Sequence, residues 1–227
     1  MANHIQIAID GPGGAGKSTI SKAVAAKLGI VYVDTGALYR TVGYYMKDHD
    51  IDPSDTAKVV KALLKIGIDV KYENGVQCVY LNSVNLGDKI RTQEIASYAS
   101  KVSAIPEVRS FLLETQKELA VKYSVIMDGR DIGTVILPYA DVKIFLTASD
   151  EVRARRRYDE LIAKGQSADY TQVLEEMRTR DAQDSSRAVA PLKPAPDAVL
   201  LDNSDLTFDE SVEKVIAIVR EKCALDD

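Results

Sequence analysis

Residues 11–18 of this 227-residue chain read GPGGAGKS, and this motif is the strongest indication of its fold. The run His4–Asp10, HIQIAID, precedes them and has the β-branched character of a short strand. Lys17–Leu28 overlaps the end of the motif and carries apolar residues every four positions, which is typical of a helix. The order is therefore a strand, a turn of the form G-x-x-x-x-G-K-[S/T] and a helix. This order predicts a loop whose backbone N–H groups wrap a phosphate chain.

The residue types of this loop predict a Mg²⁺-nucleoside triphosphate site. Glycines let the main chain approach the phosphates, and the helix N-terminus adds a partial positive charge. Lys17 is predicted to bridge the outer phosphates, and the Ser18 hydroxyl to ligate Mg²⁺. The motif alone leaves kinase, GTPase, motor and switch open, but the chain has no Asn-Lys-x-Asp guanine-reading element and no room for a motor's second domain. The predicted ATP-binding residues are Gly11, Pro12, Gly13, Gly14, Ala15, Gly16, Lys17, Ser18 and Thr19.

The remaining chain alternates strand-like and helix-like segments. The predicted strands are Ile30–Val33, Val125–Met127, Val142–Leu146 and Ala198–Leu201, and the predicted helices are Ala37–Lys47, Asp150–Ala163, Thr171–Gln183 and Phe208–Lys222. Alternation of this kind predicts an α/β fold, with a mostly parallel sheet covered by helices on both faces.

Gly67–Leu86 breaks this alternation. It reads IDVKYE, then Asn74-Gly75, then VQCVYL, and Asn-Gly readily adopts the positive φ angles of a two-residue hairpin turn. Asn82–Leu86 could add a third short strand. We therefore predict a small antiparallel insertion at about residues 55–90, outside the main sheet.

Composition narrows the function classes. The chain has 29 Lys and Arg against 34 Asp and Glu, a net charge of −5, which argues against a general nucleic-acid binder. There is no membrane-length apolar run, no signal-peptide pattern at the N-terminus, and only two cysteines, Cys78 and Cys223, which favours a cytoplasmic protein. Nothing indicates an obligate interface, so a monomer is expected.

Two further motifs sit where predicted strands end, and ligands of open α/β sheets bind at strand ends. Asp34–Arg40 reads DTGALYR, which fits a second anion site but equally a plain helix cap with a surface arginine. Val125–Thr134 reads VIMDGRDIGT, in which Asp128 is placed like a Mg²⁺-organising acid. Arg130 and Asp131 are expected to project into the same crevice, although a simple Arg–Asp turn is the alternative.

Arginine is concentrated in one window of this acidic chain, since eight of its twelve arginines lie between Arg130 and Arg187. Arg153 and Arg157 share a helical face, and Arg156 adds to it at i+3. Arg180, Asp184 and Arg187 repeat at four and three residues. A solvated face is the ordinary explanation of such a run. For Arg153, Arg157, Arg180 and Arg187 we favour phosphate binding, because guanidinium groups match phosphate oxygens.

Taken together, these motifs resemble the bacterial cytidylate kinases, a family of P-loop nucleoside monophosphate kinases. The resemblance runs over essentially the whole chain and includes GPGGAGKST, DTGALYR, IRTQEIASYASKVSAIPEVR, DGRDIGT and RDAQDSSRAVAPL. It implies a P-loop NTPase fold with a five-stranded parallel sheet, an acceptor-nucleotide domain with a small antiparallel β insertion, and a short lid. The implied parts are a core at 1–36, 105–150 and 190–227, an acceptor-binding insertion at about 37–104 and a lid at about 151–189.

The resemblance also implies roles for matching residues. Arg153 and Arg157 would approach the donor phosphates, and Asp128 would hold Mg²⁺ with Ser18 through a bridging water. Arg40, Arg130 and Arg187 would clamp the phosphate of CMP. Asp184, with Arg180, would contact the sugar. The implied CMP-binding residues are Asp34, Gly36, Tyr39, Arg40, Ser100, Arg109, Arg130, Asp131, Arg180, Asp184 and Arg187, with Ser100, Arg109 and Asp131 reading the cytosine edge.

The activity that the resemblance implies is ATP-dependent phosphorylation of CMP and dCMP, with Mg²⁺, in pyrimidine nucleotide metabolism. The implied catalytic residues are Lys17, Arg130, Arg153, Arg157 and Arg187. The partners are small nucleotides, with no nucleic acid and no membrane. Two alternatives remain: a kinase for another acceptor, such as UMP, dTMP or shikimate, and a non-enzymatic P-loop module that senses ATP.

Overall fold

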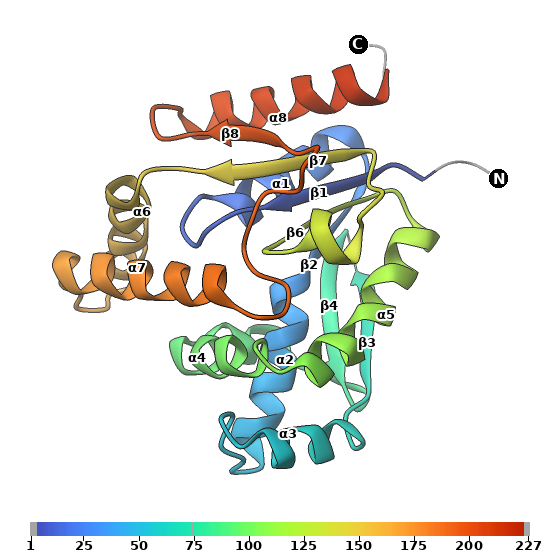
Figure 1. Cartoon of the computed structure of the whole chain (residues 1–227), viewed down its shortest axis with the longest axis vertical. Coiled ribbons are helices and arrows are strands. Elements are labelled where there is room, and N and C mark those ends of the chain that lie inside the picture. The colour runs from blue at the N-terminus through green and yellow to red at the C-terminus, as the bar shows by residue number, and fades with distance from the viewer. Residues whose placement is uncertain (1–3, 74, 225–227) are drawn as a thin grey trace. The chain divides into compact units, whose positions relative to one another are not determined.

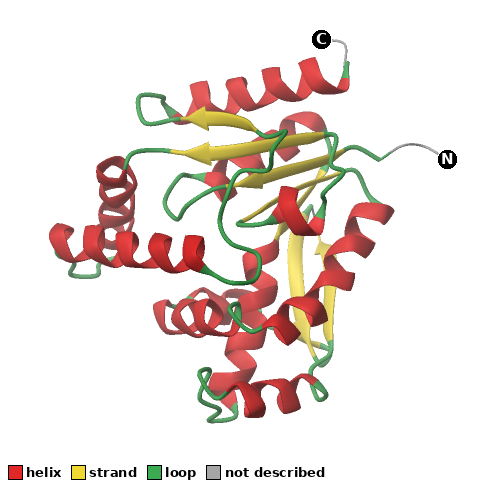
Figure 2. Cartoon of the chain, viewed as in Figure 1, coloured by secondary structure: helices red, strands yellow, loops and turns green. Residues whose placement is uncertain are grey.

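The computed structural model describes residues 4–73 and 75–224 and divides into two compact units. The first contains the described residues up to Ile30 and from Ser124 onward, and the second is Val31–Tyr123. Figure 1 labels their elements along the chain, and Figure 2 separates helices from strands.

A five-stranded sheet carries the phosphate-binding loop. Its strands are β1 (Gln6–Asp10), β2 (Val31–Asp34), β6 (Val125–Gly129), β7 (Val142–Thr147) and β8 (Val199–Asp202), in the order β2-β6-β1-β7-β8. β1 pairs in parallel with β6 and β7, and β7 pairs in parallel with β8. The central strands bury residues of both sheet faces, as in Ile7, Ala8 and Ile9, so they read as continuous apolar runs. The predicted five-stranded parallel sheet is confirmed.

The helices of the first unit are α1 (Lys17–Leu28), α6 (Asp150–Ala163), α7 (Tyr170–Ser186) and α8 (Phe208–Cys223), with a single π-helical turn, η2, at Ile132–Ile136. Helices α1 and α8 pack against strands of the sheet, whereas α6 and α7 pack against each other. α1 and α8 contact each other, while η2 contacts β1 and β6. In Figure 1, α1 lies behind the strands and the yellow-green turn of η2 lies in front. Thr207 and Glu210 start α8 with a reciprocal capping box.

The second unit contains β2 and the inserted hairpin. Its other elements are α2 (Thr35–Asp48), α3 (Thr56–Leu63), β3 (Ile68–Glu73), β4 (Val76–Leu81), β5 (Val84–Asn85), η1 (Gly87–Arg91), α4 (Gln93–Val102) and α5 (Pro106–Lys122). Strands β3, β4 and β5 form a separate antiparallel sheet in that order. The predicted hairpin is confirmed, while Asn74 of its predicted turn lies outside the described residues.

The sequence analysis did not predict three helices of this unit. α3 falls inside the segment predicted as an antiparallel insertion, and α4 and α5 follow it. Thr92 caps α4 by accepting a hydrogen bond from the Ile95 amide, and Pro106 occupies the first turn of α5. Gly43 allows α2 to approach α4, because a Cβ there would lie 2.9 Å from the Ala99 nitrogen.

No helix within residues 4–73 and 75–224 is long and apolar enough to span a membrane.

Candidate active site

The glycines of the phosphate-binding loop are required by its geometry. Gly11 has a φ of +148°, and a Cβ there would lie 1.9 Å from the carbonyl oxygen of Leu146. Gly14 and Gly16 also have positive φ, at +74° and +85°. Any side chain at these positions would strain the backbone. At Gly11 the loop therefore passes directly against the backbone of Leu146 in β7.

Lys17 is the first residue of α1 and lies almost wholly buried under this loop. Its ammonium group donates a hydrogen bond to the carbonyl oxygen of Pro12 at 2.7 Å. Burial, and then the positive charge of Arg130, hold the pKa of Lys17 well below its usual range. An anion bound beside it would oppose both effects and stabilise the charged lysine.

Ser18 and Asp128 come together although they are far apart in the sequence. The Ser18 hydroxyl donates to the Asp128 carboxylate at 2.8 Å. Asp128 lies buried near the end of β6. A hydroxyl and a carboxylate are oxygen donors of the kind Mg²⁺ prefers. The described residues contain no group of three or more His, Cys, Asp or Glu that could hold a metal, so phosphate oxygens and water would have to complete this coordination.

Arg153 fastens the loop to helices α6 and α7. Its guanidinium donates to the Gly13 carbonyl at 2.9 Å, to the Ala148 carbonyl at 3.0 Å and to the carboxylates of Asp150 and Asp181. The side chain is only 5% exposed. Arg153 thus binds the loop through the Gly13 carbonyl oxygen, and its remaining N–H groups donate to other acceptors of the protein.

Asn203 provides a second anchor. Its side-chain amide donates to the Ala15 carbonyl at 3.1 Å, and Arg156 donates in turn to the side chain and backbone oxygens of Asn203. The sequence pattern placed Arg156 next to the helix face shared by Arg153 and Arg157. In the structure Arg156 holds Asn203, which in turn holds the loop.

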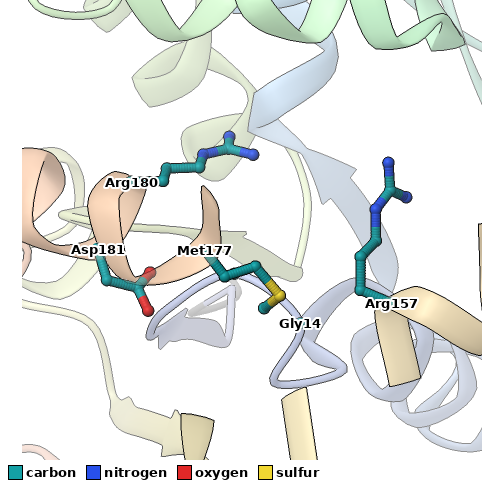
Figure 3. Close-up of a pocket in the computed structure, with 6 residues that line it drawn as sticks. Gly14, Arg157, Met177, Arg180 and Asp181 are labelled. Carbon is teal, nitrogen blue, oxygen red and sulfur yellow. The ribbon is translucent and has the colours of Figure 1, made fainter. Parts of the chain in front are cut away.

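A pocket opens at the loop and is lined by Gly13, Gly14, Arg157, Met177, Arg180 and Asp181. Figure 3 shows Arg157 and Arg180 rising from different helices on two sides of Gly14, with Met177 between them. The Arg157 guanidinium also donates to Glu160 at 2.8 Å. Two guanidinium groups beside a glycine-rich loop make this pocket suited to a phosphate-bearing ligand.

Asp184 brings together two arginines predicted to bind the acceptor phosphate. Its buried carboxylate accepts a hydrogen bond from Arg130 Nε at 2.9 Å and another from Arg187. Arg130 also donates to the Gly129 carbonyl at 3.3 Å. Arg130 of the DGRDIGT motif thus pairs with Asp184 on α7, far along the chain. A carboxylate between two guanidinium groups fixes the direction of both.

Asp10 was missed by the sequence analysis. Its carboxylate accepts hydrogen bonds from the Ile132 and Gly133 amides at 2.7 and 2.8 Å, which fixes the turn carrying Arg130 and Asp131. Burial raises the pKa of Asp10 to about 6, against the lowering effect of those two bonds. The sequence did contain a signal for Asp10. It is an acidic residue at the end of an apolar strand, directly before the glycine loop.

The second unit carries the DTGALYR motif. The Asp34 carboxylate caps α2 by accepting from the Ala37 amide at 2.9 Å and forms an ion pair with Arg40 at 2.7 Å. The helix-cap interpretation is correct, but Arg40 is not a free surface arginine. Gly36 leaves space for this pairing, because a Cβ there would lie 2.9 Å from Arg40 Nη1.

Tyr39 and Arg109 also meet within this unit. The Arg109 guanidinium lies over the Tyr39 ring, 5.5 Å from its centroid, and donates to the Ser103 carbonyl at 3.2 Å. Ser100 is half-buried, and its carbonyl accepts from the Ser103 hydroxyl at 2.8 Å. These contacts connect Tyr39, Ser100 and Arg109 as one cluster within the second unit.

The strand, glycine-rich loop and helix of the first unit, with Lys17 under the loop and Ser18 bonded to Asp128, define a P-loop nucleotide-binding α/β protein. The family model described as cytidylate kinase matches residues 7–221. The chain belongs to the cytidylate kinase family.

Relatives in this family match over nearly their full lengths. A cytidylate kinase of Fervidobacterium nodosum is 48% identical over 222 residues, covering 98% of this chain and 99% of the relative. That of Caldicellulosiruptor bescii is 49% identical over 94% of this chain and 95% of its own. That of Thermosipho melanesiensis is 47% identical over 97% and 99%.

Proposed function

We propose that this chain is an enzyme that transfers the γ-phosphoryl group of ATP to CMP, and to dCMP. One observation carries the proposal: a complete P-loop, with Lys17 and the Ser18–Asp128 pair in place, in a chain that matches cytidylate kinases along its length. A P-loop module that only senses ATP would need no second substrate site, so Arg40, Arg130, Asp131 and Arg187 would be dispensable.

The donor would bind at the glycine loop of the first unit. Backbone N–H groups of the loop and Lys17 would hold its β- and γ-phosphates. Mg²⁺, bound by Ser18 with Asp128 through water, would neutralise charge on the transferring group. Arg157 and Arg180, which line the loop pocket, would add positive charge there during transfer.

The acceptor phosphate would be held by Arg40, Arg130 and Arg187. Its oxygen is already ionised at neutral pH, so attack on the γ-phosphorus would need no general base. Positioning and neutralisation of negative charge would supply the catalysis. The ion pairs of Arg40 with Asp34, and of Arg130 and Arg187 with Asp184, support this role because they orient the arginines before a ligand arrives.

Asp131, with Ser100 and Arg109, would read the cytosine edge. Its carboxylate would accept a hydrogen bond from the exocyclic amine of cytosine and repel the carbonyl oxygen that uracil has at the same place. A mismatch of this kind costs about 1–3 kcal/mol, so UMP would be a weaker substrate. The sugar would contact Asp184 and Arg180.

An acceptor panel tests the proposal. ADP release would be measured with ATP and Mg²⁺ and, in turn, CMP, dCMP, UMP, AMP and shikimate. We expect CMP and dCMP to give the highest kcat/KM, and no turnover when EDTA removes Mg²⁺. A preference for another acceptor would show that the chain is a kinase for that acceptor. ATP binding without turnover on any acceptor would show that it is a non-enzymatic module that senses ATP.

Size-exclusion chromatography tests our inference that the enzyme is a monomer.

A further inference from the structure

Gln77, on strand β4 of the inserted hairpin, makes two hydrogen bonds to the backbone of Asp34. Its Oε1 accepts from the Asp34 N–H at 2.7 Å, and its Nε2 donates to the Asp34 carbonyl at 3.2 Å. A side-chain amide has the same donor and acceptor as a peptide group. Gln77 therefore acts toward Asp34 as a neighbouring strand would.

This contact falls where β2 needs a partner. β2 is the first strand in the sheet order, so one of its edges has no neighbouring strand among those described. Tyr72, directly opposite Gln77 in the β3–β4 register, donates its hydroxyl to the Tyr32 carbonyl at 3.3 Å. Backbone groups of residues two apart face the same side of a strand. Tyr72 and Gln77 thus cover consecutive bonding positions on this edge.

Asp34 connects this edge to the acceptor-binding motif. Its backbone is held by Gln77, and its carboxylate holds both the start of α2 and the Arg40 guanidinium. The carboxylate is 13% exposed and the arginine 22%, so water competes little for the pair. A shift of the Asp34 backbone would therefore move Arg40.

We propose that Gln77 is a positioning residue for the acceptor-nucleotide site, and that the inserted hairpin sets acceptor affinity through it. The inference rests on the proposed function, since it assigns Arg40 to the acceptor phosphate. It gives the hairpin a role in recognition that does not require any hairpin residue to touch the nucleotide.

The test uses Gln77→Met, which keeps the length of the side chain and removes both hydrogen bonds. We expect the KM for CMP to rise roughly five- to tenfold, as for the loss of one or two hydrogen bonds, with the KM for ATP within about twofold of the parent. Tyr72→Phe removes one longer bond and should have a smaller effect in the same direction. Lys71→Met, exposed on the same hairpin, is the matched control and should leave both constants unchanged.

A double-mutant cycle separates positioning from a general loss of structure. If Gln77 acts through Arg40, Gln77→Met should change CMP affinity little in an Arg40→Ala background. CMP binding by calorimetry and thermal unfolding of each variant give readouts that do not depend on turnover. Additive effects in the cycle, an unchanged KM for CMP, or equal rises in both KM values would overturn the proposal. If the parent chain itself fails to phosphorylate CMP, the proposed function is what fails.

Discussion

The phosphate-binding loop and the DTGALYR motif are held in place in different ways. The loop contains glycines with positive φ, a conformation that other residues adopt only with strain. Three side chains also donate hydrogen bonds to its carbonyl oxygens, those of Lys17, Arg153 and Asn203. The Asp34–Arg40 motif has its own cap and ion pair, and its backbone is bonded at Asp34 by the side chain of Gln77. The loop should therefore keep its shape when one supporting side chain is removed. In the acceptor motif, by contrast, the loss of one hydrogen bond should shift the position of Arg40.

Lys17→Ala tests the chemistry of the loop. Removing the only loop side chain expected to contact the outer phosphates should lower kcat by about 10³, because charge in the transition state loses a fixed partner. Steady-state ADP release measures this. Lys27→Ala, an exposed lysine of the same helix paired with Glu213, should stay within twofold of the parent. A comparable loss in both variants would mean that α1, rather than the Lys17 charge, was disturbed.

Arg153→Met tests the support of the loop. It breaks a buried network and leaves the carboxylate of Asp181 and the carbonyl of Gly13 without this donor, so the free energy of unfolding should fall by about 3 kcal/mol. Urea denaturation measures it. Arg157→Met, one turn further on the same helix, removes a partly exposed ion pair with Glu160, and such a pair contributes about 0.5 kcal/mol. If both variants lost a similar amount of unfolding free energy, Arg153 would not differ from Arg157 as a structural support of the loop.

Asp10 gives the first unit a pH dependence. Because its pKa rises from 3.8 to about 6 on folding, the protonated form stabilises the folded state, and that contribution disappears as pH rises through 6. A shift of this size corresponds to about 2–3 kcal/mol. The unfolding free energy of the parent minus that of Asp10→Asn should therefore decrease by this amount between pH 4 and pH 7. A constant difference would show that Asp10 does not titrate in this range.

The same two regions show what sequence can and cannot predict. The loop, its strand and α1 follow from a local motif and local periodicity, and the hairpin from β-branched runs around a glycine turn. Asp10, Arg153 and Gln77 were missed as supports because their partners lie 122, 140 and 43 residues away. Local spacing shows that charged residues are concentrated in one part of the chain, but it does not show that Arg130 pairs with Asp184, 54 residues away.

Asp131→Ala tests the comparison between the loop and the acceptor motif with the smallest expected effect. Asp131 belongs to the first unit, which carries the phosphate-binding loop, but it is proposed to recognise the acceptor base. Asp131 is buried on the turn held by Asp10. Loss of its carboxylate should raise the KM for CMP and reduce the preference for CMP over UMP roughly tenfold, with the KM for ATP little changed. The ratio of kcat/KM values for the two acceptors measures this, and the exposed Asp205→Ala serves as control. An unchanged ratio would remove Asp131 from base recognition, and a raised KM for ATP would assign its effect to the loop.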